Sequence, residues 1–66
     1  MNTYYDVQKL LLKYGIITYL GDKEAEIQLS IIELKALYDE GILPEADYQR
    51  ANLILRKERQ DIQKER

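Results

Sequence analysis

The chain has 66 residues, of which 45% are apolar and 33% are charged, and its formal net charge is −2 at pH 7. A chain this short forms at most one domain, and folding buries only ~60% of the surface that the unfolded chain exposes. It contains no cysteine and no histidine, which excludes disulfides, thiolate metal sites and histidine-based catalysis. Self-association is the remaining common way to stabilise so small a chain.

The first predicted helix spans about residues 3–14. Thr3 is a good N-cap, and Asp6 follows three residues later, which is a capping box with Asp in place of Glu or Gln. An apolar stripe then recurs at helical spacing. Its members are Tyr4, Val7, Leu10, Leu11 and Tyr14. Gly15 stands where a helix commonly ends in a left-handed residue.

The next segment is GIITYLG, residues 15–21, which is rich in β-branched and aromatic residues and is bounded by glycines. Such residues favour strands, but a lone strand has no pairing partner in so short a chain. We therefore expect an extended connector at 15–21. Its apolar side chains Ile16, Ile17 and Leu20 are expected to lie over the core.

The second predicted helix spans about residues 22–40, with Asp22 as its N-cap. At ~100° per residue its apolar side chains form two stripes. One stripe consists of Ile27, Ile31, Leu34, Leu37 and Tyr38. The other, which we call the outer stripe, consists of Ala25, Leu29, Ile32 and Ala36. A helix that is apolar on two sides is either central or part of an oligomer interface, so the outer stripe is either a self-association surface or is covered within one chain.

The stretch DEGILPEADY, residues 39–48, predicts a corner between two helices. Gly41 can end the second helix in a left-handed conformation, and Pro44 suits the first position of the next helix. The third predicted helix spans about 44–62 and packs through several apolar residues. They are Tyr48, Ala51, Ile54, Leu55 and Ile62. The chain is then mostly polar, so the helical tail 59–66 is expected to fray, project into solvent or meet a partner. The sequence predicts one all-α, three-helix domain over 1–66.

Motifs for catalysis or metal binding are weak. Ser30 is the only serine and has no visible base, so a small side chain at a helix contact explains it better than a nucleophile does. The acidic clusters fall at predicted helix ends, where capping and the helix dipole account for them. The three glycines are scattered and form no phosphate-binding loop. We therefore expect no enzymatic activity, no metal, no cofactor and no small-molecule substrate.

Charge is distributed unevenly along the chain. Residues 1–47 carry 4 basic and 9 acidic side chains, whereas residues 48–66 carry 6 and 3. The candidate contacts to single-stranded nucleic acid are Lys9, Lys13, Arg50, Arg56, Lys57 and Arg59. Tyrosines could add stacking, but a pI of about 5.0 is far from the basic footprint of nucleic-acid-binding domains. The alternative is a solvated helix with paired charges.

The N-terminal segment MNTYYDVQKLLLKY lacks the features of a secretory signal, and no apolar run approaches the ~20 residues of a membrane span. We therefore expect a cytoplasmic protein without a membrane partner. The favoured function is a small, non-catalytic interaction module that binds an unknown protein partner or forms a homodimer. The alternative is binding of single-stranded nucleic acid through the basic third helix.

Five segments form a pattern that extends over about residues 1–58. They are NTYYDVQKLL at the start, Tyr14-Gly15, Gly21-Asp22, LKALY at 34–38 and ANLILRKE at 51–58. Together they resemble the YqgQ-like family of small proteins from low-GC Gram-positive bacteria. The resemblance implies a three-helix fold and an intracellular location. It implies no established activity and no defined site residues, and a suggestion of single-stranded nucleic-acid binding attaches to such proteins.

Overall fold

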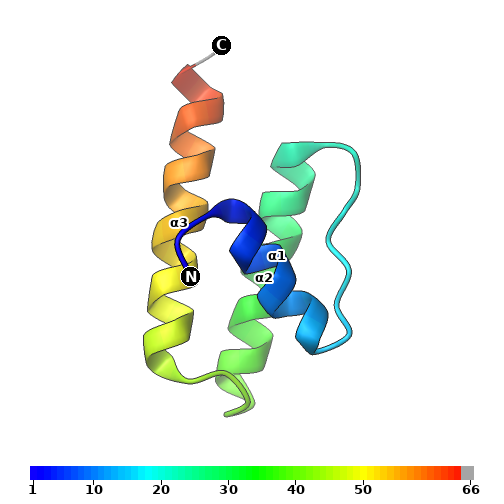
Figure 1. The fold of residues 1–66 in the computed structure, drawn as a ribbon, viewed down its shortest axis with the longest axis vertical. Helices are drawn as coiled ribbons and strands as arrows, with labels where there is room; N and C mark the ends of the chain where they lie inside the picture. Colours follow the sequence, from blue (N-terminus) through cyan, green and yellow to red (C-terminus); the bar gives the residue numbers. More distant parts are fainter. Residues whose placement is uncertain (65–66) are drawn as a thin grey trace.

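A computed structural model of the chain describes residues 1–64, which form three helices and no strand. Helix α1 spans Tyr4–Lys13, α2 spans Lys23–Asp39 and α3 spans Glu45–Lys64. Helices α2 and α3 lie side by side, and α1 packs across both of them (Figure 1). The predicted all-α, three-helix fold is confirmed. Helix α3 continues through Lys64, so residues 59–64 of the predicted tail are helical, and the last two residues of the tail lie outside the described part.

The helices begin where the sequence provides caps. Thr3 Oγ1 accepts a hydrogen bond from the Asp6 N–H at 3.2 Å, and Asp6 Oδ2 accepts one from the Thr3 N–H at 3.1 Å. This is the reciprocal capping box that the sequence predicts. Asp22 caps α2 as expected. Pro44 stands just before α3 rather than within it, and its carbonyl accepts a hydrogen bond from the Tyr48 N–H at 3.0 Å.

Both α1 and α2 end at a left-handed glycine. Gly41 has φ 75°, which side chains with a β-carbon rarely adopt. The Gly41 N–H donates to the Tyr38 carbonyl at 3.0 Å, and the Ile42 N–H donates to the Leu37 carbonyl at 2.9 Å. This pair of bonds satisfies the last carbonyls of α2 in a Schellman motif. Gly15, with φ 78°, ends α1 in the same way.

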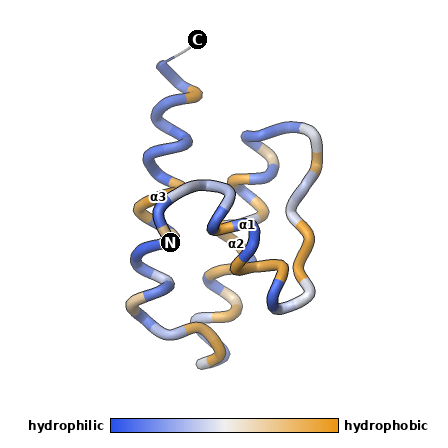
Figure 2. The backbone as a smooth tube through the Cα atoms, in the orientation of Figure 1, coloured by the Kyte–Doolittle hydropathy of each residue, from blue (hydrophilic) through white to orange (hydrophobic). Residues whose placement is uncertain are grey.

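The core lies where the three helices meet, and the last turns of α3 extend beyond it as a hydrophilic segment (Figure 2). Its buried hydrophobic residues are Val7, Leu11, Ile27, Leu34, Leu37, Leu43, Ala51, Ile54 and Leu55. Tyr38 and Tyr48 stack between α2 and α3 with ring centroids 4.3 Å apart. Ile62 packs against the core, as predicted. Tyr14 is a correction: it is 40% exposed because α1 has ended before it.

The connector between α1 and α2 is extended and unpaired, as predicted, but it faces differently from the expectation. Thr18 is fully buried, whereas Ile17 is 65% exposed and Leu20 is 54% exposed. Of the three residues expected over the core, only Ile16 packs there. Successive side chains of an extended chain point to opposite sides. Once Thr18 faces the helices, Ile17 and Tyr19 must therefore face solvent.

Candidate interaction surfaces

A polar network is built around Glu26 near the start of α2. Its Oε1 accepts hydrogen bonds from the Tyr4 hydroxyl at 2.9 Å and from Gln8 Nε2 at 3.2 Å. Its Oε2 accepts hydrogen bonds from the backbone N–H groups of Leu20 at 2.9 Å and Gly21 at 3.0 Å. One carboxylate therefore joins α1, the connector and α2. The sequence interpretation missed this role because it explained the acidic cluster that contains Glu26 by capping and the helix dipole.

Electrostatics agree with a structural role for this network. Desolvation acts to raise the pKa of Glu26, but its hydrogen-bond donors outweigh that effect and hold the pKa below its usual value. Burial, and then the hydrogen bond to Glu26, raise the pKa of the Tyr4 hydroxyl. Lys23 Nζ lies 5.1 Å from the centroid of the Tyr4 ring and 2.7 Å from Glu58 Oε2. Since both oxygens of Glu26 are occupied by groups of the fold, the network offers no free base.

Ser30, the only serine, is accounted for by the fold. Ser30 is fully buried, and its hydroxyl donates to the Glu26 carbonyl of its own helix at 2.8 Å. No group of three or more carboxylates in this part of the chain is arranged to hold a metal ion. No helix within the described range is long and apolar enough to cross a membrane.

The two candidate cations on α1 are neighbours on one exposed face. Lys9 and Lys13 line a shallow groove that also contains Asp6 and Asp47. Lys9 Nζ lies 5.5 Å from the centroid of the Tyr5 ring, which is within the range of a cation–π interaction. The two carboxylates reduce the positive potential of this groove.

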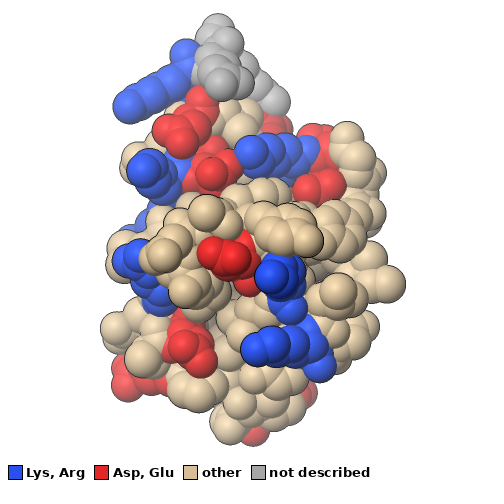
Figure 3. Space-filling view, in the orientation of Figure 1, with Lys and Arg blue, Asp and Glu red and all other residues tan. Residues whose placement is uncertain are grey.

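The four candidate cations on α3 are distributed around the helix. Arg50 is held by the N-terminal segment, where its guanidinium donates to the Met1 carbonyl and to Asn2 Oδ1, both at 3.0 Å. Arg59 lines a groove with Glu24 and Gln28 of α2. The remaining pair, Arg56 and Lys57, are adjacent and so lie ~100° apart around the helix. The structure therefore does not gather the six cations into one track, and acidic side chains are interspersed with basic ones on the face seen in Figure 3.

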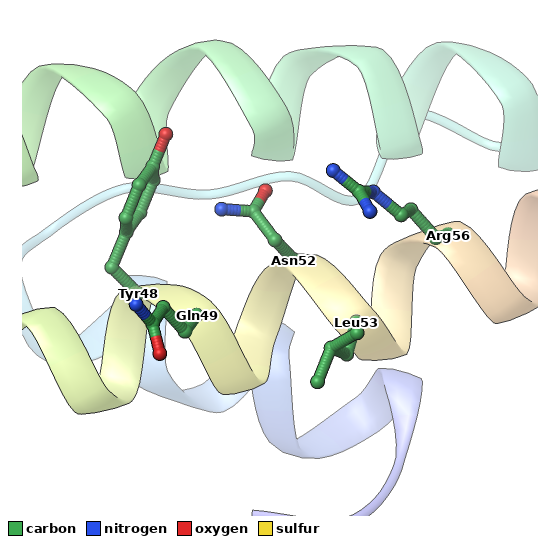
Figure 4. Close-up of a pocket in the computed structure, with 5 residues that line it drawn as sticks. All are labelled: Tyr48, Gln49, Asn52, Leu53 and Arg56. Carbon is green, nitrogen blue, oxygen red and sulfur yellow. The ribbon is translucent and has the colours of Figure 1, made fainter.

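A shallow groove runs along α3 beside α2. It is lined by Tyr48, Gln49, Asn52, Leu53 and Arg56. The side chains of Tyr48, Asn52 and Arg56 extend toward α2, whereas Leu53 points away from it (Figure 4). The groove thus places an aromatic ring, an amide and a guanidinium in one row.

The outer stripe of α2 is half covered. Ala25 and Leu29, toward the start of the helix, are half-buried, whereas Ile32 is 64% exposed and Ala36 is exposed. The first half is thus shielded within the chain, as one alternative expects. The second half is open, as the other alternative expects.

Exposed apolar side chains are concentrated near the N-terminus. Seven of the ten large hydrophobic residues that are exposed fall within residues 1–20. They are Met1, Tyr5, Leu12, Tyr14, Ile17, Tyr19 and Leu20. The sequence interpretation placed the surplus apolar surface on the second helix. It missed the share of Ile17, Tyr19 and Leu20 because helical periodicity does not report on an extended segment.

Comparisons with known proteins point the same way as the resemblance of the sequence segments. A family model described as YqgQ-like matches residues 1–61. A Bacillus subtilis (strain 168) protein named "Uncharacterized protein YqgQ" is 48% identical to this chain over 58 residues, which are 88% of this chain and 82% of that protein. Since both matches cover nearly the whole three-helix domain, the chain belongs to the YqgQ-like family.

Proposed function

We propose that the protein is a non-catalytic interaction module of the cytoplasm that binds a second copy of itself through the outer stripe of α2. The observation that supports this proposal best is the position of Ile32. It is 64% exposed on a helix whose other side carries the fully buried Ile27 and Leu34. A helix that is apolar on both sides but covered on one has a surface suited to a partner.

The energetics favour a symmetric partner. Burying an isoleucine side chain completely contributes roughly 1.5–3 kcal/mol relative to leaving it exposed. In a two-fold dimer each such gain occurs twice, because the same patch is used by both copies. A 66-residue chain without cysteine has few other ways to supplement a small core.

Charged substitutions in the outer stripe test the proposal. Leu29→Glu combined with Ile32→Glu should convert a dimer into a monomer in sedimentation experiments while far-UV circular dichroism keeps its helical signature. The matched control is Gln28→Glu with Gln60→Glu, because both glutamines are exposed and the added charge is the same. A wild-type protein that stays monomeric at high micromolar concentration contradicts the proposal. A double variant that unfolds shows instead that the stripe is internal core.

A second candidate function is binding of single-stranded nucleic acid, and the groove on α3 favours it. Its Arg56 can contact a phosphate, its Asn52 can hydrogen-bond a base edge, and its Tyr48 is aromatic. One face of the Tyr48 ring is already stacked on Tyr38, which leaves less of the ring for a base. The dispersed cations and the net charge of −2 place this candidate second.

A further inference from the structure

We infer that the two-fold axis of the self-associated protein passes through the connector, so that Ile17, Tyr19 and Leu20 meet the same residues of a second copy. This inference rests on the proposed self-association and specifies its centre. The outer stripe of α2 then forms the periphery of the interface. The commonest soluble oligomers are two-fold dimers that use one patch on both copies.

The connector presents these side chains in a fixed arrangement. Thr18 is fully buried and faces the helices, so its neighbours Ile17 and Tyr19 point outward. At one end of the connector the Ile16 N–H donates to the Leu11 carbonyl at 3.1 Å. At the other end the Leu20 N–H is held by Glu26 at 2.9 Å. Binding through such a pre-ordered segment avoids much of the entropy cost of ordering a loop.

The connector presents exposed apolar side chains next to α2, to which Glu26 ties it through the backbone of Leu20 and Gly21. The connector runs along the side of α2 that is opposite to α3 (Figure 1), and much of its length is hydrophobic (Figure 2). Ile17 is 65% exposed, Tyr19 50% and Leu20 54%, and tyrosine is enriched in protein interfaces. Three of the four residues 17–20 are thus exposed apolar side chains.

The distribution of charge favours a second copy as the occupant. In a two-fold interface the residues nearest the axis meet their own copies, so a charged residue there meets a like charge. Residues 14–21 form the longest stretch of the sequence without a charged residue, and they include the whole connector. Around Ile32, by contrast, Glu33 is adjacent in sequence and Lys35 is paired with Asp39 on the next turns at 2.8 Å. Such charges suit the rim of an interface rather than its axis.

The test compares three variants by sedimentation equilibrium. Ile17→Glu combined with Tyr19→Glu should raise the dimer dissociation constant at least about thirtyfold, as expected for residues at an interface centre. Ile32→Glu should raise it less than about tenfold. Leu53→Glu is the control for a single added charge, because Leu53 is 57% exposed on α3, and it should leave the constant unchanged.

Disulfide trapping gives a second measurement that does not depend on weakening the dimer. The chain has no cysteine, so a single introduced cysteine reports only on its own distance from the second copy. Tyr19→Cys should form a disulfide-linked dimer on mild oxidation, because residues beside a two-fold axis can reach the Cα separation of ~6 Å that a disulfide needs. Leu53→Cys should not.

The outcomes separate this inference from the proposed function. If the wild type is monomeric at high micromolar concentration, both are wrong. If the wild type is a dimer that Ile32→Glu dissociates, while the connector variant stays dimeric and Tyr19→Cys does not cross-link, self-association stands and the inference is wrong. If the connector variant dissociates most and Tyr19→Cys cross-links, the connector is the centre of the interface. If the exposed connector instead binds a different protein or a nucleic acid, the purified chain should show neither a dimer that the connector variant dissociates nor cross-linking of Tyr19→Cys.

Discussion

Glu26 illustrates how much of this fold depends on one polar side chain. Tyr4 and Gln8 of α1 and the backbone of Leu20 and Gly21 all donate to its carboxylate. A carboxylate only accepts hydrogen bonds, which is what four converging donors require. Within residues 1–64 the connector makes no β-ladder hydrogen bonds with another strand. The Glu26 carboxylate therefore replaces part of the backbone pairing that a strand would have.

Glu26→Gln should therefore destabilise the protein although it preserves the shape of the side chain. One acceptor oxygen becomes an NH₂ group, so either the two backbone donors of the connector or the Tyr4 and Gln8 side chains lose their acceptor. We expect a loss of about 1–2 kcal/mol, measured as a lower midpoint of urea unfolding. Glu33→Gln is the control, because the Glu33 side chain makes no hydrogen bond within residues 1–64. Equal midpoints for the two variants would contradict the role assigned to Glu26.

Glu26→Gln also predicts how the stability of the fold depends on pH. The folded pKa of Glu26 lies below its usual value, so its contribution is fully present above the unfolded pKa of about 4.3 and is lost as pH falls through the folded pKa. The stability difference between wild type and Glu26→Gln should hold near neutral pH and shrink below about pH 4. Urea unfolding at several pH values measures it. A difference that persists unchanged at the acid end would show that the ionised form is not what matters.

Thr18, unlike Glu26, carries a buried polar group, the hydroxyl Oγ1, without a hydrogen-bond partner among the described residues. Thr18→Val removes this unsatisfied hydroxyl and keeps the shape, so it should stabilise the protein by about 1 kcal/mol, or roughly 4–8 °C in Tm for a domain of this size. Thr3→Val is the same chemical change at a cap, where it should lower Tm. A fall in Tm for both variants would mean that the Thr18 hydroxyl is satisfied in solution.

At the scale of the elements, the helix boundaries were predictable and the facing of the connector was not. Thr3, Asp22 and the two glycines act on groups only a few residues away, so local chemistry places the helix ends within two residues of the prediction. Which side of the connector is buried depends on the anchor at Glu26, which is a tertiary contact. Residue type alone therefore favoured Ile17 and Leu20, whereas the structure buries Thr18.

The corner between α2 and α3 gives a prediction at this scale. A β-carbon added to Gly41 would meet nothing within 4 Å, so the cost of a substitution is the strain of its positive φ alone. Gly41→Val should destabilise by about 1–2 kcal/mol, and Gly41→Asn by less, because asparagine tolerates the left-handed region better. Thermal melts measure both. Identical Tm values for the three proteins would contradict the left-handed corner.

At the scale of the whole molecule, the fold buries the apolar residues between its three helices but leaves part of the outer stripe of α2 and the outward residues of the connector exposed. The sequence predicted half of the candidate interface, because the outer stripe of α2 is visible in helical periodicity. It could not predict the other half, because the outward residues of the connector are defined only by how that segment lies on the helices. The six cations were visible in composition, but their separation over α1 and α3 follows from packing.

The separation of the six cations leads to a prediction for the affinity of the protein for nucleic acid. Binding to phosphates releases counterions, so the affinity of a true binder falls steeply with salt. Arg56→Gln, Lys57→Gln and Arg59→Gln combined should weaken any binding equally for all sequences and flatten its salt dependence. Lys9→Gln with Lys13→Gln is the control on α1.

Fluorescence anisotropy with labelled single-stranded RNA and DNA at two salt concentrations measures both effects. We expect weak binding or none near physiological salt, because the first 47 residues carry 9 acidic and 4 basic side chains and the remaining cations do not form one track. A protein that associates through its uncharged connector should also keep its oligomeric state in the triple variant. Tight binding that the triple variant loses and the α1 control keeps would make nucleic-acid binding the favoured function and would assign it to α3.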